Sequence, residues 1–142
     1  MARLAELIDE LSLAARIEDG RYEPNMQETD SLELAREAVT RLGADRVRLR
    51  GEGAPVYVER AATGRGVSAL VQAALRHGGL DEVTVSVRGP ELEIEPITDS
   101  SARVVLAEDL RDLGAAVAVR QLVALGASVA VEDAVLRIRL PR

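Results

Sequence analysis

The chain has 142 residues, 47% hydrophobic and 30% charged, a balance typical of one compact folded domain rather than of a disordered segment. Its formal net charge of −6 argues against nucleic acids and anionic membranes as partners. The sequence contains no cysteine, and all 18 basic residues are arginine, which excludes disulfides, thiol catalysis, Schiff-base chemistry and a phosphate-binding lysine.

The first predicted element is a helix over residues 2–19. Its apolar residues recur at spacings of four, three and four, the pattern of a coiled-coil seam: Leu4, Ile8, Leu11 and Ala15. The seam either packs on its own domain or pairs with a second copy. We favour a homodimer, because a polar linker, expected over 20–30, separates this helix from the rest of the chain. There is no signal peptide and no apolar run of roughly 20 residues, so we expect a cytoplasmic protein.

A single domain is expected over residues 31–142. Apolar spacings of three and four predict helices over 31–42, 60–77 and 115–125, and 102–113 could form one more. Alternating apolar residues predict strands at 47–49, 56–58, 83–87, 92–97, 129–131 and 135–140. Tight turns at Gly89-Pro90 and Asp133-Ala134 favour antiparallel pairing. The expected fold class is therefore α/β (α+β): a two-layer sandwich with a mixed, mainly antiparallel sheet and helices on one face.

Three side-chain placements follow from these elements. In the helix over 115–125 we expect Val119, Leu122 and Val123 to face inward. The single histidine, His77, ends the helix over 60–77, where we expect it to contact the last carbonyl groups or solvent. An acidic stripe and a basic stripe alternate with apolar residues along two predicted strands: Glu91, Glu93 and Glu95, and Arg46, Arg48 and Arg50. We interpret the acidic stripe as a solvated face. The arginines of the basic stripe could pair with it across the sheet.

Three stretches, together with the order of the elements, carry a resemblance to a known family. Residues 7–24, LIDELSLAARIEDGRYEP, resemble the end of a dimerisation helix and the linker after it. Residues 56–79 resemble a strand and an N-box helix, and residues 112–142 resemble a last glycine box, its helix and a terminal hairpin. Jointly they resemble the ATP-binding domain of sensor histidine kinases, the histidine-kinase-like ATPase (GHKL or Bergerat) fold, over nearly the whole chain.

The resemblance implies that the N box has lost its metal ligand. The asparagine that holds Mg²⁺ in the family corresponds to Ala73, and a second frequent asparagine one turn earlier corresponds to Ala69. Alanine has no oxygen to offer a metal that demands near-octahedral oxygen ligands.

The two glycine boxes depart from the family pattern as well. The Asp-x-Gly-x-Gly box, which binds adenine, corresponds to residues 95–99, where Glu95 replaces the aspartate and no glycine remains. The last glycine box, which binds phosphate through backbone N–H groups at a helix start, keeps only Gly114. Asp112 would place a negative charge where the triphosphate lies.

These losses predict a non-catalytic signalling module, a pseudo-ATPase without cofactor, metal or catalytic residues. It would act by protein–protein interaction in bacterial-type two-component signalling, with a response regulator, a kinase or another copy as partner. Two alternatives stay open. One is a nucleotide-binding kinase domain with divergent boxes, in which Glu95 and Gly114 contact Mg–ATP. The other is a histidine phosphotransferase-like protein in which His77 is phosphorylated, because residues 1–19 contain no histidine.

Overall fold

The computed structural model of the chain describes residue 15 and residues 25–42, 45–106 and 112–142. The predicted seam lies outside the described residues except for Ala15, which is helical and half-buried. The helices and strands occur in this order: β1 (Gln27–Asp30), α2 (Ser31–Thr40), β2 (Val47–Gly53), β3 (Pro55–Val58), α3 (Arg60–Gly78), β4 (Val83–Gly89), β5 (Glu91–Glu95), α4 (Asp99–Val105), α5 (Leu113–Ala124), β6 (Ser128–Glu132) and β7 (Val135–Arg139).

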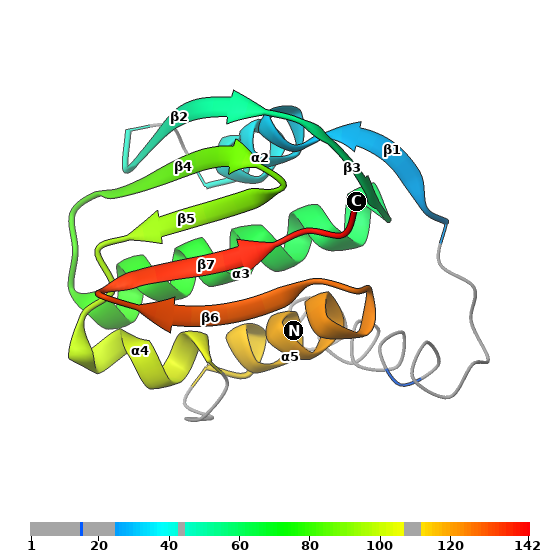
Figure 1. Cartoon of the computed structure of the whole chain (residues 1–142). Helices are drawn as coiled ribbons and strands as arrows, with labels where there is room; N and C mark the ends of the chain where they lie inside the picture. Colours follow the sequence, from blue (N-terminus) through cyan, green and yellow to red (C-terminus); the bar gives the residue numbers. More distant parts are fainter. Residues whose placement is uncertain (1–14, 16–24, 43–44, 107–111) are drawn as a thin grey trace.

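The strands form one five-stranded sheet and one small ribbon. The sheet has the order β2-β4-β5-β7-β6, in which β2 and β4 are parallel and all other neighbours are antiparallel. The ribbon pairs β1 with β3 in antiparallel fashion. The helices lie on one face of the large sheet and leave its other face open (Figure 1). The predicted two-layer α/β class with a mixed, mainly antiparallel sheet is therefore confirmed.

Two segments differ from the sequence-based expectation. β1 lies inside the stretch 20–30, for which we predicted a linker, and it forms because its backbone pairs with β3. α4 begins at Asp99, earlier than the predicted start at residue 102. The reason is a capping box, in which the Thr98 N–H donates to the Ser101 hydroxyl at 3.1 Å and the Thr98 side chain accepts from the Ser101 N–H.

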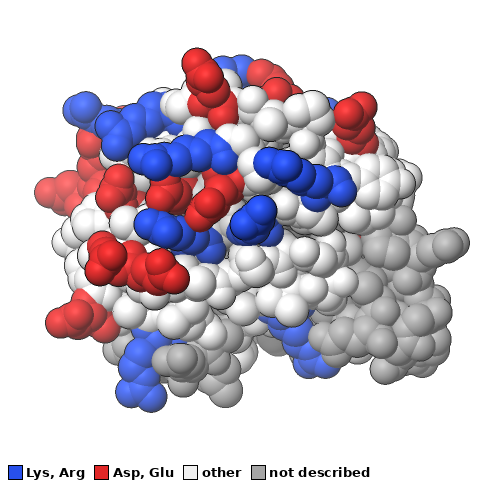
Figure 2. All heavy atoms as spheres, in the orientation of Figure 1, with Lys and Arg blue, Asp and Glu red and all other residues white. Residues whose placement is uncertain are grey.

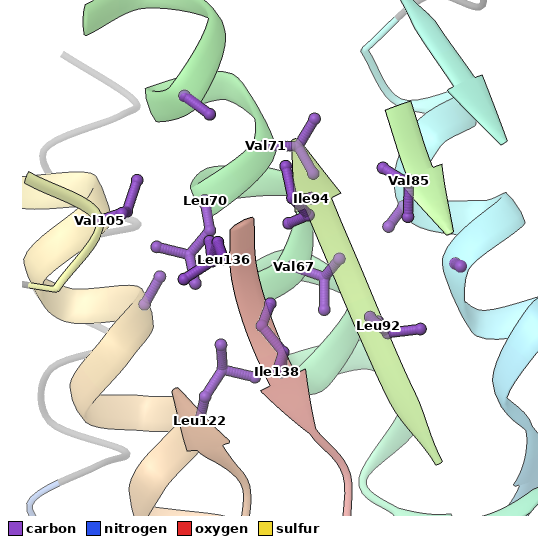
Figure 3. Close-up of a cluster of buried hydrophobic side chains, with 14 of the residues drawn as sticks. Val67, Leu70, Val71, Val85, Leu92, Ile94, Val105, Leu122, Leu136 and Ile138 are labelled. Atoms are coloured by element: carbon purple, nitrogen blue, oxygen red, sulfur yellow. The ribbon is translucent and has the colours of Figure 1, made fainter. Parts of the chain in front are cut away.

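An aliphatic core fills the space between the sheet and the helices (Figure 3). The largest fully buried apolar side chains of the two layers come from α2, α3, α5 and two strands of the sheet, β5 and β7: Leu34, Val67, Leu70, Val71, Leu92, Ile94, Leu122, Leu136 and Ile138. Each contributes roughly 1.5–3 kcal/mol of transfer free energy when it leaves water. Among the described residues, no aromatic side chain belongs to this hydrophobic core.

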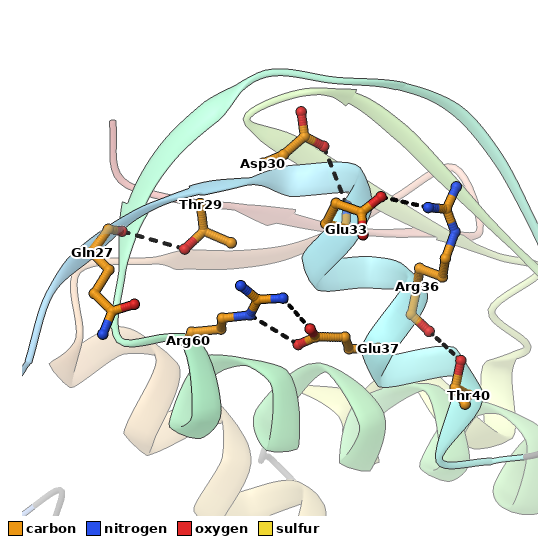
Figure 4. Close-up of polar contacts among 8 residues, drawn as sticks. All are labelled: Gln27, Thr29, Asp30, Glu33, Arg36, Glu37, Thr40 and Arg60. Carbon is orange, nitrogen blue, oxygen red and sulfur yellow. Dashed lines mark hydrogen bonds and ion pairs between the residues drawn. The ribbon is translucent and has the colours of Figure 1, made fainter.

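Polar contacts fix α2 beside the start of α3 (Figure 4). The Asp30 carboxylate caps α2 by accepting from the Leu32 and Glu33 N–H groups at 2.9 and 3.2 Å. Arg60, the first residue of α3, forms an ion pair with Glu37 of α2. The Arg60 hydrogen bond lowers the pKa of the Glu37 carboxyl. These contacts set the position of α3, whose far end carries the candidate site.

The open face of the sheet carries interleaved arginine and glutamate side chains (Figure 2). The Glu93 carboxylate lies between Arg88 and Arg137, at 2.8 and 3.4 Å, and its side chain is only 11% exposed. The predicted solvated acidic face is thus wrong for Glu93. Because β4 separates β2 from β5, the predicted pairing of the two charged stripes is reduced, among the described residues, to Arg50 and Glu95 at 3.7 Å.

Candidate functional site

Three elements meet where the sequence predicted the remains of ligand boxes: the C-terminal end of α3, the start of α4 and the start of α5. The Ser100 hydroxyl of α4 donates to the His77 carbonyl of α3 at 2.8 Å. Asp112 is the N-cap of α5, and its carboxylate accepts from the Ala115 N–H at 3.1 Å. Gly114 is buried in the first turn of this helix. The structure thus brings Gly114, Asp112 and His77 to one region.

The Asp112 carboxylate connects α5 to α3. Its second oxygen lies 3.1 Å from His77 Nε2 and 3.9 Å from Arg76 Nη1. The Asp112 side chain is 7% exposed and that of His77 is 18% exposed. The expectation that His77 contacts the last carbonyl groups of its helix or solvent is therefore wrong, because its ring is bound to an acid from the next helix. We call this contact between Asp112, His77 and Arg76 the Asp112 clasp.

The surroundings of Asp112 favour its charged form. Burial by itself would raise the pKa of the Asp112 carboxyl, but the Ala115 N–H, the hydrogen bond and charge of His77, and the charge of Arg76 outweigh it. The pKa of Asp112 is consequently lower than the ordinary value. The N-terminus of α5, where the helix dipole attracts negative charge, therefore already holds the Asp112 carboxylate.

The two alanines of the predicted N box lie in the helical layer. Ala73 is 1% exposed and belongs to the hydrophobic core, and Ala69 is half-buried against it. Val104 and Val105 of α4, which packs on α3, are fully buried. The position that corresponds to the metal-binding asparagine is thus packed among apolar side chains.

Glu95 lies on the other side of the sheet. It is the last residue of β5, where the inward-facing neighbour Ile94 is fully buried. The Glu95 side chain is 41% exposed and pairs with Arg50 on the open face. The structure therefore does not bring Glu95 together with Ala73 and Gly114.

A surface hollow of about 350 Å³ lies between β1, α2 and the start of α3, where the Glu37–Arg60 ion pair lines it. It is at the opposite end of the 19-residue helix α3 from the Asp112 clasp. Within the described ranges, no group of three or more His, Cys, Asp or Glu side chains could hold a metal ion. No helix in this part of the chain combines the length and hydrophobicity needed to cross a membrane.

Comparison with solved structures identifies the fold. No protein-family model matches the sequence, and no curated protein matches it. Solved structures do match it. Histidine kinase AdeS from Acinetobacter baumannii superposes with a TM-score of 0.68 at 18% identity, over 99% of this chain and 79% of AdeS.

Two further structures agree with AdeS. The cytoplasmic segment of histidine kinase QseC gives a TM-score of 0.67 at 12% identity, over 96% of this chain and 89% of that one. The ATP-binding domain of PrrB from Mycobacterium tuberculosis gives 0.63 at 22% identity, over 82% and 97%. At these identities the likeness establishes the fold. The chain has the histidine-kinase-like ATPase fold, as the resemblance predicted.

Proposed function

We propose that this domain is a non-catalytic signalling module, a pseudo-ATPase that retains the histidine-kinase-like fold but binds partner proteins instead of ATP. The observation that carries this proposal is the Asp112 carboxylate at the N-terminus of α5. It accepts the Ala115 N–H and is held by His77 and Arg76. In the resembling kinases this helix start binds phosphate, so a fixed carboxylate there would repel the triphosphate.

The fit of Mg–ATP to the remaining residues is poor. The Ala73 side chain has no oxygen atom and is 1% exposed within an apolar core. A metal ion would therefore find no side-chain ligand and no solvated space at that position. Glu95, the stand-in for the adenine-binding aspartate, is engaged with Arg50 on the opposite face of the sheet. These observations disfavour a nucleotide-binding kinase domain with divergent boxes.

The histidine phosphotransferase alternative has less support than the non-catalytic signalling module. A phosphoacceptor imidazole must reach a phosphoryl donor, whereas the His77 side chain is 18% exposed and its Nε2 lies 3.1 Å from Asp112. The acid would also repel the incoming phosphoryl group. We therefore assign His77 a structural role, joining α3 to α5.

The proposed partners are proteins of two-component signalling, a response regulator or a kinase, in the cytoplasm. AdeS, QseC and PrrB are histidine kinases, and their fold provides the motivation. A second copy would join through the predicted N-terminal seam of Leu4, Ile8, Leu11 and Ala15. A seam of two to three heptads is short for a stable coiled coil, so this dimer would need additional surface.

The decisive experiment is calorimetric titration of the full chain with ADP and ATP, with and without Mg²⁺. We expect no binding heat up to millimolar nucleotide. The ATP-binding domain of PrrB, titrated under the same conditions, is the comparison protein. Micromolar affinity that strengthens with Mg²⁺ would refute the proposal and return the domain to the nucleotide-binding class.

An Asp112→Ser variant refines the same titration. Serine keeps an N-cap oxygen for the helix but removes the negative charge. We expect no binding heat when this variant is titrated with Mg–ATP, because the Ala73 side chain still offers no metal ligand. Mg²⁺-dependent binding by Asp112→Ser would mean that the carboxylate alone blocks a site that is otherwise intact.

A further inference from the structure

The strand β6 forms an edge of the five-stranded sheet and lacks the features that usually protect such edges. Its sequence, Ser128–Glu132, contains no proline and no glycine, and its only charge is on the last residue. Exposed strand edges are normally blocked by charges, prolines or bulges because their free backbone groups can pair with another strand. The opposite edge, β2, carries Arg48, Arg50 and Glu52.

The backbone groups that face outward from β6 can be assigned from its hairpin. Asp133 and Ala134, both with positive φ, form a two-residue turn, so the flanking pair Glu132 and Val135 exchanges hydrogen bonds across the ladder. Alternate residues of β6 then face β7. The N–H and C=O groups of Val129 and Val131 consequently point to the open edge.

The helix α5, which contacts β6, carries two exposed large hydrophobic side chains. α5 lies along the same side of the molecule as β6 (Figure 1). Leu113 and Val123 of α5 are each 55% exposed, and they are two of the three large hydrophobic side chains exposed in the described part of the chain. Val129 and Val131 are only half-buried. A strand added to β6 would pair with the outward-facing backbone groups of Val129 and Val131 at this edge of the described sheet.

We propose that β6 pairs with β6 of a second copy of this chain, antiparallel about a two-fold axis through Ala130. In this register Val129 of each copy exchanges hydrogen bonds with Val131 of the other, and the two Ala130 side chains face each other without a clash. The sheets of the two copies then form one continuous sheet. The edge would pair in this way whether or not the domain binds nucleotide.

Charge complementarity selects a second copy as the occupant. In this register Glu132 lies opposite Ser128 of the second copy, whose neighbour on β7 is Arg139. Glu132 is 64% exposed and lies 3.5 Å from Arg137 Nη1 of its own chain, whereas Arg139 is exposed and makes no ion pair in the described part of the chain. The two-fold axis repeats this Glu132–Arg139 contact, so each dimer gains two complementary pairs on the open face.

The dimer is expected to be weak. A five-residue strand is roughly 17 Å long, and the contact is smaller than the about 800 Å² per partner of a standard interface. Sedimentation of the full chain from micromolar to millimolar concentration should therefore show reversible self-association. Amide exchange measured by NMR should slow with concentration at Val129 and Val131, whereas Ala130, whose N–H faces β7, should not change.

Three substitutions test the register. Ala130→Lys places two cations opposite each other and should weaken association at least about tenfold, whereas Ala130→Ser should not. Glu132→Arg should weaken association, and the double variant Glu132→Arg with Arg139→Glu should restore it. The variant Leu4→Glu with Leu11→Glu, in the predicted seam, is the comparison. Absence of self-association, or association that responds to the seam variant but not to Ala130→Lys and the charge exchange, would overturn the proposal.

Discussion

At the scale of single residues, the Asp112 clasp makes the stability of the fold depend on pH. The pKa of Asp112 is lowered in the folded state, so its contribution is complete above the unfolded value, about 3.9, and is lost as the pH falls through the folded value. Asp112→Asn keeps a capping oxygen but removes the charge that His77 and Arg76 contact. We expect it to lower the free energy of unfolding by about 1–2 kcal/mol at pH 7.

Urea unfolding at several pH values checks this expectation. The stability difference between the wild type and Asp112→Asn should persist from pH 7 to about pH 5 and disappear progressively below about pH 4. Glu28→Gln, which removes an exposed carboxylate of β1, is the control and should leave the pH profile unchanged. A difference that stays constant down to pH 2 would show that the Asp112 charge does not contribute.

A second single residue, Gln121, lowers the stability of the core in which it is buried. It is fully buried in α5, and within the described part of the chain neither its amide nitrogen nor its amide oxygen has a hydrogen-bond partner. A buried amide without partners costs about 1–3 kcal/mol. Gln121→Met, of similar volume, should raise the free energy of unfolding by about 1 kcal/mol or more in urea titrations. The exposed Gln27→Met should be neutral, and a destabilised Gln121→Met would mean that the amide is satisfied in solution.

The sequence predicted these residues only in part. It identified Asp112 as a charge in the wrong place for triphosphate, but it did not predict the contact with His77, because that contact depends on how α5 packs on α3. It also placed Val123 inward, whereas Val123 is 55% exposed and Gln121 is buried. In a helix where nearly every residue is apolar, hydrophobic periodicity cannot define the buried face.

At the scale of elements, Gly66 of α3 limits how closely α3 and α5 approach, whereas Gly64 of the same helix does not. A Cβ at Gly66 would lie 2.9 Å from Leu122 Cγ of α5, whereas a Cβ at Gly64 would lie 3.8 Å from Leu34 Cδ1. Gly64→Ala should therefore stabilise the protein by about 0.5–1 kcal/mol through helix propensity. Gly66→Ala should destabilise it by about 1–3 kcal/mol, because the α3–α5 contact must open.

The two variants are matched controls for each other, since both convert glycine to alanine within one helix. Thermal unfolding measures both. Opposite signs would establish that Gly66, and not Gly64, is required for close helix packing. Two variants with the same sign would mean that the α3–α5 contact adapts without cost. Helix propensity treats the two glycines alike, because it does not register a neighbouring helix.

Hairpins, which have a local sequence pattern, were predicted well. Strand pairs that join segments distant in the chain were not. The hairpins β4–β5 and β6–β7 were predicted because turn residues and alternating valines coincide. β1, with the sequence Gln-Glu-Thr-Asp, has no apolar alternation and forms a strand only because β3 pairs with it. The parallel contact of β2 with β4 was also beyond local patterns, since α3 lies between the two strands in the chain.

At the scale of the whole molecule, the fold and the ligand boxes have separate requirements. The fold needs aliphatic side chains in two layers, and these are present from α2 to β7. The resemblance implies that ligand binding needs an asparagine at the position of Ala73 and glycine boxes at residues 95–99 and 112–115. In this chain the same region is occupied by Ala73, Val104, Val105 and the Asp112 clasp. The sandwich can therefore remain stable while its ligand chemistry changes.

An asparagine at the position that the resemblance assigns to the N box tests that separation. Ala73 is 1% exposed in the core, so Ala73→Asn buries an amide without partners and should lower the free energy of unfolding by about 1–3 kcal/mol. Ala69→Asn, at a half-buried position of the same helix, should cost less. Both are measured by thermal unfolding with and without Mg–ATP. In a solvated nucleotide site, Ala73→Asn would be tolerated, and Mg–ATP would raise its Tm by preferential binding to the folded state. Because Ala73 lies in the packed core, we expect Mg–ATP to leave the Tm of both variants unchanged.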